Sequence, residues 1–236
     1  MMNMKVLSIG AHPDDTELLC AGTLARYAKE GHQVFICHLC DGDKGSATHT
    51  SKEIAEIRRK EAINSAHVIG ATSMWGGLSD GEVVLNLDGR AKVIDVIRQA
   101  DPDLIMTHSP YDYHSDHINT SKLVFEATYL ANLKLWKSDY DASTKLPYLY
   151  YMDTLAGINF EPQEYVDITD TIDTKIEMML KMQSQLGWLK DMHDCDAPEF
   201  IKSVAKFRGF QAAVPYAEAF AQQKMYPQGL TKRVLP

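Results

Sequence analysis

Long apolar runs are missing from this sequence. No stretch approaches the roughly 18 consecutive apolar residues that a membrane-spanning helix needs, so we expect no membrane span. The first residues lead straight into a predicted strand, without the apolar region and cleavage site of a signal peptide. These two absences favour a cytoplasmic location.

Cysteine is also scarce. Four cysteines in 236 residues do not make a disulfide framework. Cys37 and Cys40 match the pattern C-x-x-C, but they lie in an apolar run typical of a strand, where residues three apart point to opposite faces. Because no second pair accompanies them, we expect buried structural thiols rather than a metal or redox site.

Positive charge is in deficit, with 24 Lys and Arg against 32 Asp and Glu and a net charge of −8. The one basic cluster, 58–60, lies on a predicted helix where Glu53, Glu56 and Glu61 offset it. A nucleic acid partner is therefore not expected.

Nucleotide-binding motifs are absent as well. The turn after the first predicted strand contains G-A-H-P-D-D where a dinucleotide-binding fold has G-x-G-x-x-G. The sequence contains no G-x-x-x-x-G-K-[ST]. Dinucleotide binding and phosphate cradling are both disfavoured.

Strands and helices alternate over the first 135 residues, which predicts an α/β fold with a Rossmann-like, mostly parallel sheet and helices on both faces. Apolar patterning and glycine stops give the expected bounds. Strands are expected at 5–9, 33–39, 72–75 and 104–107, and helices at 18–30, 51–69 (capped by Ser51), 88–99 and 119–133.

The second part of the sequence is less regular. We expect it to form an irregular α/β extension packed on the same domain, so that 1–236 is one domain. Strands are expected at 147–153 and 164–168, and helices at 171–189, 197–206 and 216–223.

Two polar loops follow the first and fourth predicted strands. Parallel strands bring their carboxyl ends to one edge of the sheet, so loops about 100 residues apart can converge there. Two histidines and one carboxylate with an open fourth position are typical of a catalytic zinc site, and they equally describe non-haem ferrous iron. The loops offer His12, Asp14, Asp15, His114, Asp116 and His117.

Each loop alone has a simpler interpretation. A single histidine is more often a packing or surface residue, and Asp14, Asp15 or Thr16 could cap the first helix. The joint occurrence of both loops at matching strand ends favours the metal site. His108, close to the second loop, is a candidate for a supporting role.

Ala11–Glu17 (A-H-P-D-D-x-E) and His114–His117 (H-x-D-H) together resemble the signature of the PIG-L/LmbE-like family of zinc-dependent N-acetylglucosamine deacetylases. The helix motif R-x-x-E beginning at Arg58 and the D-G turn at Asp80 resemble the family too. Segments 166–170, 184–185 and 216–220 resemble the bacillithiol-pathway branch, which deacetylates N-acetylglucosaminyl malate.

This resemblance implies that His12, Asp15 and His117 bind zinc. It implies that Asp14 is the general base, taking a proton from zinc-bound water and later delivering it to the leaving amine. Zinc and ferrous iron remain alternatives at this point.

The same resemblance assigns the supporting residues. His114 would stabilise the tetrahedral oxyanion or act as the acid, with Asp116 holding its ring. Arg58 and Asp80 would face the sugar. Some relatives place a tyrosine two residues before the first histidine of H-x-D-H, whereas this sequence has Asp112 there, so no tyrosine is assigned a catalytic role.

The expected function is therefore metal-dependent removal of an N-acetyl group from an N-acetylglucosamine-type conjugate, with N-acetylglucosaminyl malate as one substrate. The alternative is a sugar- or metal-binding protein on the same fold that has lost its chemistry. The resemblance also implies a small-molecule sugar substrate and a homo-oligomer, a trimer or hexamer.

Overall fold

The computed structural model describes residues 3–226, which contain a single seven-stranded sheet. The strand order is β3-β2-β1-β4-β5-β7-β6, and the first five strands are mutually parallel. β7 pairs antiparallel with both β5 and β6. The predicted fold, an α/β fold with a mostly parallel sheet and helices on both faces, is confirmed.

The elements alternate as the sequence pattern predicts over the first half of the chain. Their order is β1 (Lys5–Gly10), α1 (Asp15–Leu19), α2 (Ala21–Lys29), β2 (Gln33–Cys40), α3 (Ser51–Val68), β3 (Thr72–Leu78), α4 (Leu87–Ala100), β4 (Leu104–Thr107), α5 (Ser115–Leu130), β5 (Tyr148–Met152), the 3-10 turn η1 (Leu155–Gly157), β6 (Glu164–Asp167), α6 (Ile172–Met179), α7 (Gln183–His193), α8 (Ala197–Ala212) and β7 (Ala217–Gln222).

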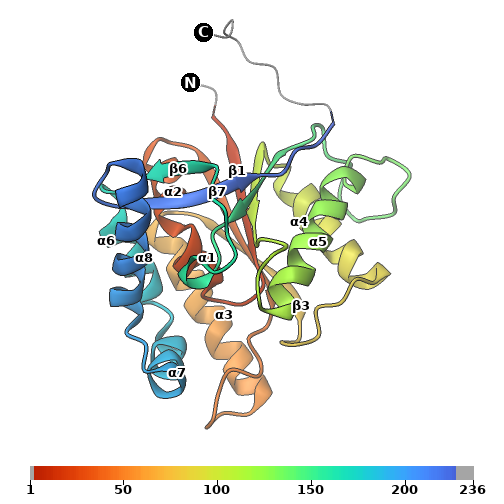
Figure 1. The fold of residues 1–236 in the computed structure, drawn as a ribbon. Helices are drawn as coiled ribbons and strands as arrows, with labels where there is room; N and C mark the ends of the chain where they lie inside the picture. The colour runs from red at the N-terminus through yellow and green to blue at the C-terminus, as the bar shows by residue number, and fades with distance from the viewer. Residues whose placement is uncertain (1–2, 227–236) are drawn as a thin grey trace, which may run out of the picture.

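β1 is buried because it lies between two parallel neighbours and under helices on both faces. Val6, Leu7 and Ile9 are fully buried, as expected for a central parallel strand that is apolar on both sides. Alternate residues enter different cores: Val6 packs with α1, α2 and α6, whereas Leu7 and Ile9 pack with α4 and α5. Figure 1 shows α4 and α5 on one side of the sheet and α2, α6 and α8 on the other.

The strand order creates a switch point between β1 and β4. The chain proceeds outward from β1 through β2 to β3 and then returns to place β4 on the other side of β1. Connections from β1 and β4 therefore leave in opposite directions and open a crevice at the carboxyl ends of these strands, where ligands bind in open α/β sheets. Every helix described between residues 3 and 226 is too short or too polar to cross a membrane.

The segment 216–223 is not the predicted helix but the strand β7. Alanine and glutamate favour a helix locally, but tertiary context overrides that weak preference. Phe220 lies opposite Met152 of β5 and Glu164 of β6, so the backbone of β7 is paired on both sides. Glu218 is also buried, and its carboxylate accepts hydrogen bonds from the first backbone amides of α2.

Other predicted bounds also differ from the structure. The helix predicted at 18–30 is divided at Cys20, and the one predicted at 171–189 is divided between α6 and α7. Thr50, not Ser51, caps α3, in a capping box with Glu53. α5 begins at Ser115, four residues before the predicted start, which places the H-x-D-H motif at a helix N-terminus.

We expect Glu218→Ala to lower the free energy of unfolding by about 3–5 kcal/mol, because it leaves Lys175 charged and unpaired in the interior. Urea denaturation measures this loss. The matched control is Glu30→Ala, which removes the exposed Arg26–Glu30 pair and should cost less than about 1 kcal/mol. Equal losses from the two variants would contradict the assignment of Glu218 as a structural anchor.

Candidate metal-dependent active site

The turn between β1 and α1 holds Asp14 in an unusual conformation. Asp14 has φ 142°, a region that side chains other than glycine rarely adopt, and it is nine-tenths buried. It occupies the N-cap position of α1, yet its carboxylate makes no capping hydrogen bond. The interpretation of the Asp14 side chain as a helix cap is therefore wrong. Its carboxylate faces the cleft instead.

His12, Asp15 and His117 form a group that could hold a metal ion. One ligand atom from each lies within 4.8 Å of the others. The Oδ1 atom of Asp15 lies 3.2 Å from Nε2 of His117, and its Oδ2 atom lies 3.4 Å from Nδ1 of His12. Residues from the ends of β1 and β4 thus converge as the sequence predicts.

Two further carboxylates fix the rings of these histidines. Nε2 of His12 lies 3.1 Å from Oδ2 of Asp116, and Nδ1 of His117 lies 3.1 Å from Oδ2 of Asp112. In each imidazole, therefore, one nitrogen contacts the carboxylate of Asp116 or Asp112, and the other nitrogen faces Asp15. This is the usual arrangement around metal-ligating histidines, so the residues present fit a zinc or iron ion.

The carboxylates around His12 and His117 favour the protonated form of both rings unless a metal cation is bound between them. Burial by itself would lower the pKa of His12, but its hydrogen bonds with Asp116 and Asp15 raise it to about 10. In the same way, Asp15 and Asp112 outweigh burial and raise the pKa of His117 to about 9. His117 and His108 hold the pKa of Asp15 well below its usual range despite its burial.

Burial raises the pKa of Asp14 to about 7, with the guanidinium of Arg58 opposing the shift. Nη2 of Arg58 lies 3.7 Å from the Asp14 carboxylate. A carboxyl group whose pKa lies near neutrality is suited to accept a proton and to give it back.

His114 is the N-cap residue of α5, and its ring is held by the backbone. Nδ1 accepts a hydrogen bond of 3.2 Å from the amide of Asp116. The Asp116 carboxylate, expected against the His114 ring, lies on His12 instead. Because burial and the neighbouring histidines lower the pKa of His114, the neutral ring carries its proton on Nε2 and can donate it as a hydrogen bond.

Arg58 and Asp80, predicted to face the sugar, line the cleft but are tied into the protein. Arg58 donates to the carbonyl oxygen of Pro13 at 2.7 Å, directly before Asp14. Asp80 accepts hydrogen bonds from the amides of Gly42 and Lys44. Gly42 has φ +69°, and a Cβ there would lie 2.4 Å from Cδ of Arg58, so only glycine lets this loop close over Arg58.

Sequence reasoning did not assign the roles of two nearby residues. The role of Asp112 was left open, and in the structure Asp112 orients the His117 ring. His108, a candidate for a supporting role, is fully buried and stacks on His117 with ring centroids 3.9 Å apart. It also lies 3.1 Å from Asp15. Burial and His117 lower the pKa of His108 to about 4, so it is neutral. The sequence signal that could have assigned these roles is the position of both residues between β4 and the H-x-D-H motif.

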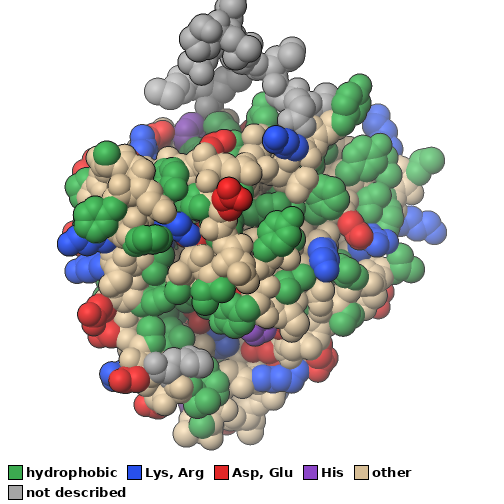
Figure 2. Space-filling view, in the orientation of Figure 1, with side chains coloured by type: hydrophobic (Ala, Val, Ile, Leu, Met, Phe, Trp, Pro, Cys, Tyr) green, Lys and Arg blue, Asp and Glu red, His purple; other side chains and the backbone are tan. Residues whose placement is uncertain are grey.

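The cleft above these residues has a volume of about 470 Å³. Its far wall comes from η1 and α7, and Glu61 of α3 anchors α7 by accepting hydrogen bonds from the amide and hydroxyl of Ser184. In Figure 2, histidine side chains reach the surface below the centre of the molecule, between hydrophobic and acidic side chains. The cleft is lined by His12, Asp14, Asp15, Leu18, Lys44, Gly45, Arg58, Asp80, Gly81, Tyr113, His114, Ser115, Asp116, His117, Leu155, Gln185, Trp188 and Leu189.

Known proteins share this fold. A 4-oxalmesaconate hydratase from Pseudomonas putida is 25% identical over 236 aligned residues, covering 95% of this chain and 87% of its own. The crystal structure of GalB, the 4-carboxy-2-hydroxymuconate hydratase from Pseudomonas putida KT2440, superposes with TM-score 0.82 at 24% identity, covering 98% of this chain and 100% of its own.

The N,N'-diacetylchitobiose deacetylase from Pyrococcus horikoshii superposes equally well. Its TM-score is 0.82 at 25% identity, over 94% of this chain and 84% of its own. These relatives include a hydratase and a deacetylase, and neither name belongs to the bacillithiol pathway. The PIG-L family profile, described as GlcNAc-PI de-N-acetylase, matches residues 7–128, the part of the chain that contains both histidine motifs. The chain therefore belongs to the PIG-L family.

Proposed function

We propose that this protein is a zinc-dependent hydrolase that removes the N-acetyl group from an uncharged N-acetylglucosamine-type conjugate. The observation that carries the proposal is the carboxylate of Asp14. It lies beside His12 and Asp15, is held in a strained turn, and does not cap the helix that it precedes. A base that is buried, does not cap a helix and is adjacent to a metal-binding group suits amide hydrolysis.

Zinc held by His12, Asp15 and His117 would polarise the acetyl carbonyl and lower the pKa of water to about 7. Ferrous iron would suit the same ligands, so zinc is part of the proposal. Asp112 and Asp116 orient the two histidine rings and increase their basicity as ligands.

The residues of the chain then carry the protons. Asp14 accepts the proton that the attacking water gives up and returns it to the sugar nitrogen as the carbon–nitrogen bond breaks. His114 donates its Nε2 proton in a hydrogen bond to the carbonyl oxygen as that oxygen becomes negative. Arg58 keeps Asp14 in place through its hydrogen bond to the Pro13 carbonyl.

The charge of the cleft favours an uncharged substrate. Its two basic side chains are already paired: Arg58 lies between Asp14 and Asp80, and Lys44 lies 2.8 Å from Glu82. Four carboxylates, those of Asp14, Asp15, Asp80 and Asp116, line the same cleft. Among the described residues that line the cleft, each lysine or arginine has a carboxylate partner, so a substrate with several negative charges would meet no unpaired basic side chain there besides the ion itself.

A second candidate is hydration of an unsaturated polycarboxylate, favoured by the hydratase relative that spans 95% of this chain. The charge of the cleft argues against that substrate class. The negative charge of the cleft also weighs against N-acetylglucosaminyl malate as the substrate. The support for that substrate is the resemblance of the tail segments to the bacillithiol-pathway branch. An inactive binding protein is disfavoured because each position that hydrolysis needs is filled by a competent residue.

We expect Asp14→Asn to lower deacetylation by about 10²- to 10⁴-fold without loss of bound zinc, because it removes the base and no ligand. His117→Ala should lose the metal itself. Zinc content by atomic absorption and amine release from diacetylchitobiose measure the two effects, with Asp88→Asn on the exposed start of α4 as the control. Wild-type turnover in Asp14→Asn would refute the base assignment.

Zinc binding at pH 7 should release close to two protons, because the pKa values of about 10 for His12 and about 9 for His117 leave both rings protonated in the zinc-free protein. Proton release should decline as the pH rises through 9 to 10, where the free rings have already lost their protons. Calorimetry in buffers of different ionisation enthalpy measures the number. No proton release at pH 7 would contradict the charge state derived for the site.

A panel of N-acetylglucosamine conjugates tests the substrate class. We expect amine release from the free sugar, the chitobiose and the inositol conjugate to exceed that from the malate conjugate, and a chelator to abolish all of it. Fluorescent detection of the freed amine provides the rates. If the malate conjugate were the best substrate, the charge argument would be wrong; if none released an amine, deacetylation would be.

A further inference from the structure

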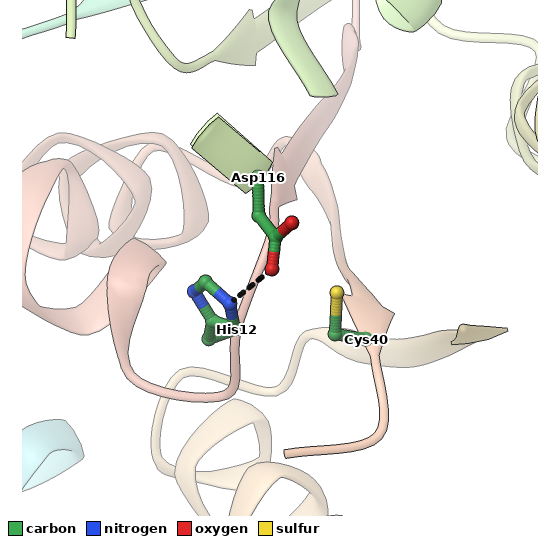
Figure 3. A group of neighbouring side chains, drawn as sticks. All are labelled: His12, Cys40 and Asp116. Atoms are coloured by element: carbon green, nitrogen blue, oxygen red, sulfur yellow. Dashed lines mark hydrogen bonds and ion pairs between the residues drawn. The ribbon is translucent and has the colours of Figure 1, made fainter. Parts of the chain in front are cut away.

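Cys40 lies against the active site, on the side of His12 that faces away from Asp15. It is the last residue of β2 and is fully buried. Its Sγ atom, a ring nitrogen of His12 and a carboxylate oxygen of Asp116 all lie within 4.8 Å of one another. Figure 3 shows the thiol directed toward the Asp116 carboxylate, with the His12 ring on the other side of that carboxylate.

Asp116 brings an unsatisfied oxygen to this group. Its Oδ2 atom accepts the amide of Gly81 at 2.6 Å and lies 3.1 Å from Nε2 of His12. Its Oδ1 atom is buried and has no hydrogen-bond partner among the described residues. In Figure 3 this oxygen is the one that points away from the His12 ring. A buried carboxylate oxygen without a donor is unfavourable, and a cation would satisfy it.

The electrostatic environment also suits a cation. Asp15, Asp80 and Asp116, which line the adjoining cleft, place negative charge close to the Cys40 thiol. A metal ion relieves this repulsion and takes the place of the thiol proton, since the thiolate is the form that binds metal. His12 and Asp116 both line the cleft, which gives an ion a route to Cys40.

We propose that Cys40, Asp116 and Nε2 of His12 form a second metal site, which binds a soft divalent ion such as zinc or cadmium and inhibits the enzyme. Thiolate, imidazole and carboxylate together select such ions over magnesium or manganese. On binding, the thiol proton and the Nε2 proton of His12 pass to solvent, and the metal bonds replace the His12–Asp116 hydrogen bond.

Inhibition follows because His12 is shared. Its Nδ1 atom faces Asp15 in the group that could hold the catalytic ion, and the hydrogen bond from Nε2 to Asp116 sets that orientation. A second ion on Nε2 removes this hydrogen bond and adds positive charge beside the first site. The inhibitory part of the proposal rests on the proposed function, whereas metal binding by Cys40 does not.

Cadmium titration of the whole protein tests the binding directly, because a cadmium–thiolate bond produces a strong ultraviolet charge-transfer band. We expect the wild-type protein to develop the band and Cys40→Ser and Cys40→Ala to lack it. Cys37→Ala is the matched control, since Cys37 is buried on the same strand but belongs to none of the groups of described residues that could hold a metal ion. Cys37→Ala should keep the band, and so should His117→Ala, which removes a residue of the first group only.

Activity assays provide the second readout. Excess zinc should inhibit the wild-type enzyme at least tenfold more strongly than it inhibits Cys40→Ser, with equal rates at one equivalent of zinc. A thiolate band that persists in both Cys40 variants, or that never forms in the wild-type protein, would overturn the site. A band that depends on Cys40 in a protein without deacetylase activity would leave the site standing and refute the proposed function instead.

Discussion

The contact between Asp15 and His117 is the constraint on which the active site depends. These residues come from the ends of β1 and β4, about 100 positions apart in the sequence, and their side chains lie 3.2 Å apart. Only the pairing of β1 with β4 at the switch point of the sheet brings them together. The fully buried residues of β1 therefore serve the chemistry as well as the core, because they fix the edge at which both loops meet.

Around that contact, the protein buries more charge than a core normally tolerates. Each imidazole is placed between carboxylates, and Arg58 is placed between Asp14 and Asp80. Such a network costs desolvation energy. A divalent ion among His12, Asp15 and His117 would balance it, which connects the unusual pKa values of the site with the chemistry that the family performs.

The sequence was sufficient to predict the parallel sheet and the meeting of the two polar loops, because apolar strands ending in polar loops follow a simple geometric rule. The choice of His12, Asp15 and His117 among the residues of those loops rested on the resemblance to the family. The sequence could not reveal which carboxylate orients which ring: Asp116 lies on His12, and Asp112 lies on His117. Those pairings depend on where α5 begins. Local patterning also failed at β7, where pairing with two strands and the buried Glu218 outweigh helix propensity.

Cys40 illustrates the same limit. The C-x-x-C spacing in an apolar run predicted buried thiols at Cys37 and Cys40, and both are buried. Yet Cys40 stands at the carboxyl end of β2, at the edge of the sheet where His12 lies, and the strand pattern alone could not show the distance between them. Position along a strand, more than motif, decides which residues reach this site.

The most direct measurement compares two reactions of one zinc-loaded sample. The protein is incubated in parallel with N,N'-diacetylchitobiose and with 4-oxalmesaconate, and acetate release and loss of the unsaturated substrate are followed together. We predict stoichiometric acetate and amine from the sugar, sensitive to a chelator, and negligible hydration of the polycarboxylate. Rapid hydration of the polycarboxylate with no acetate from the sugar would contradict the account.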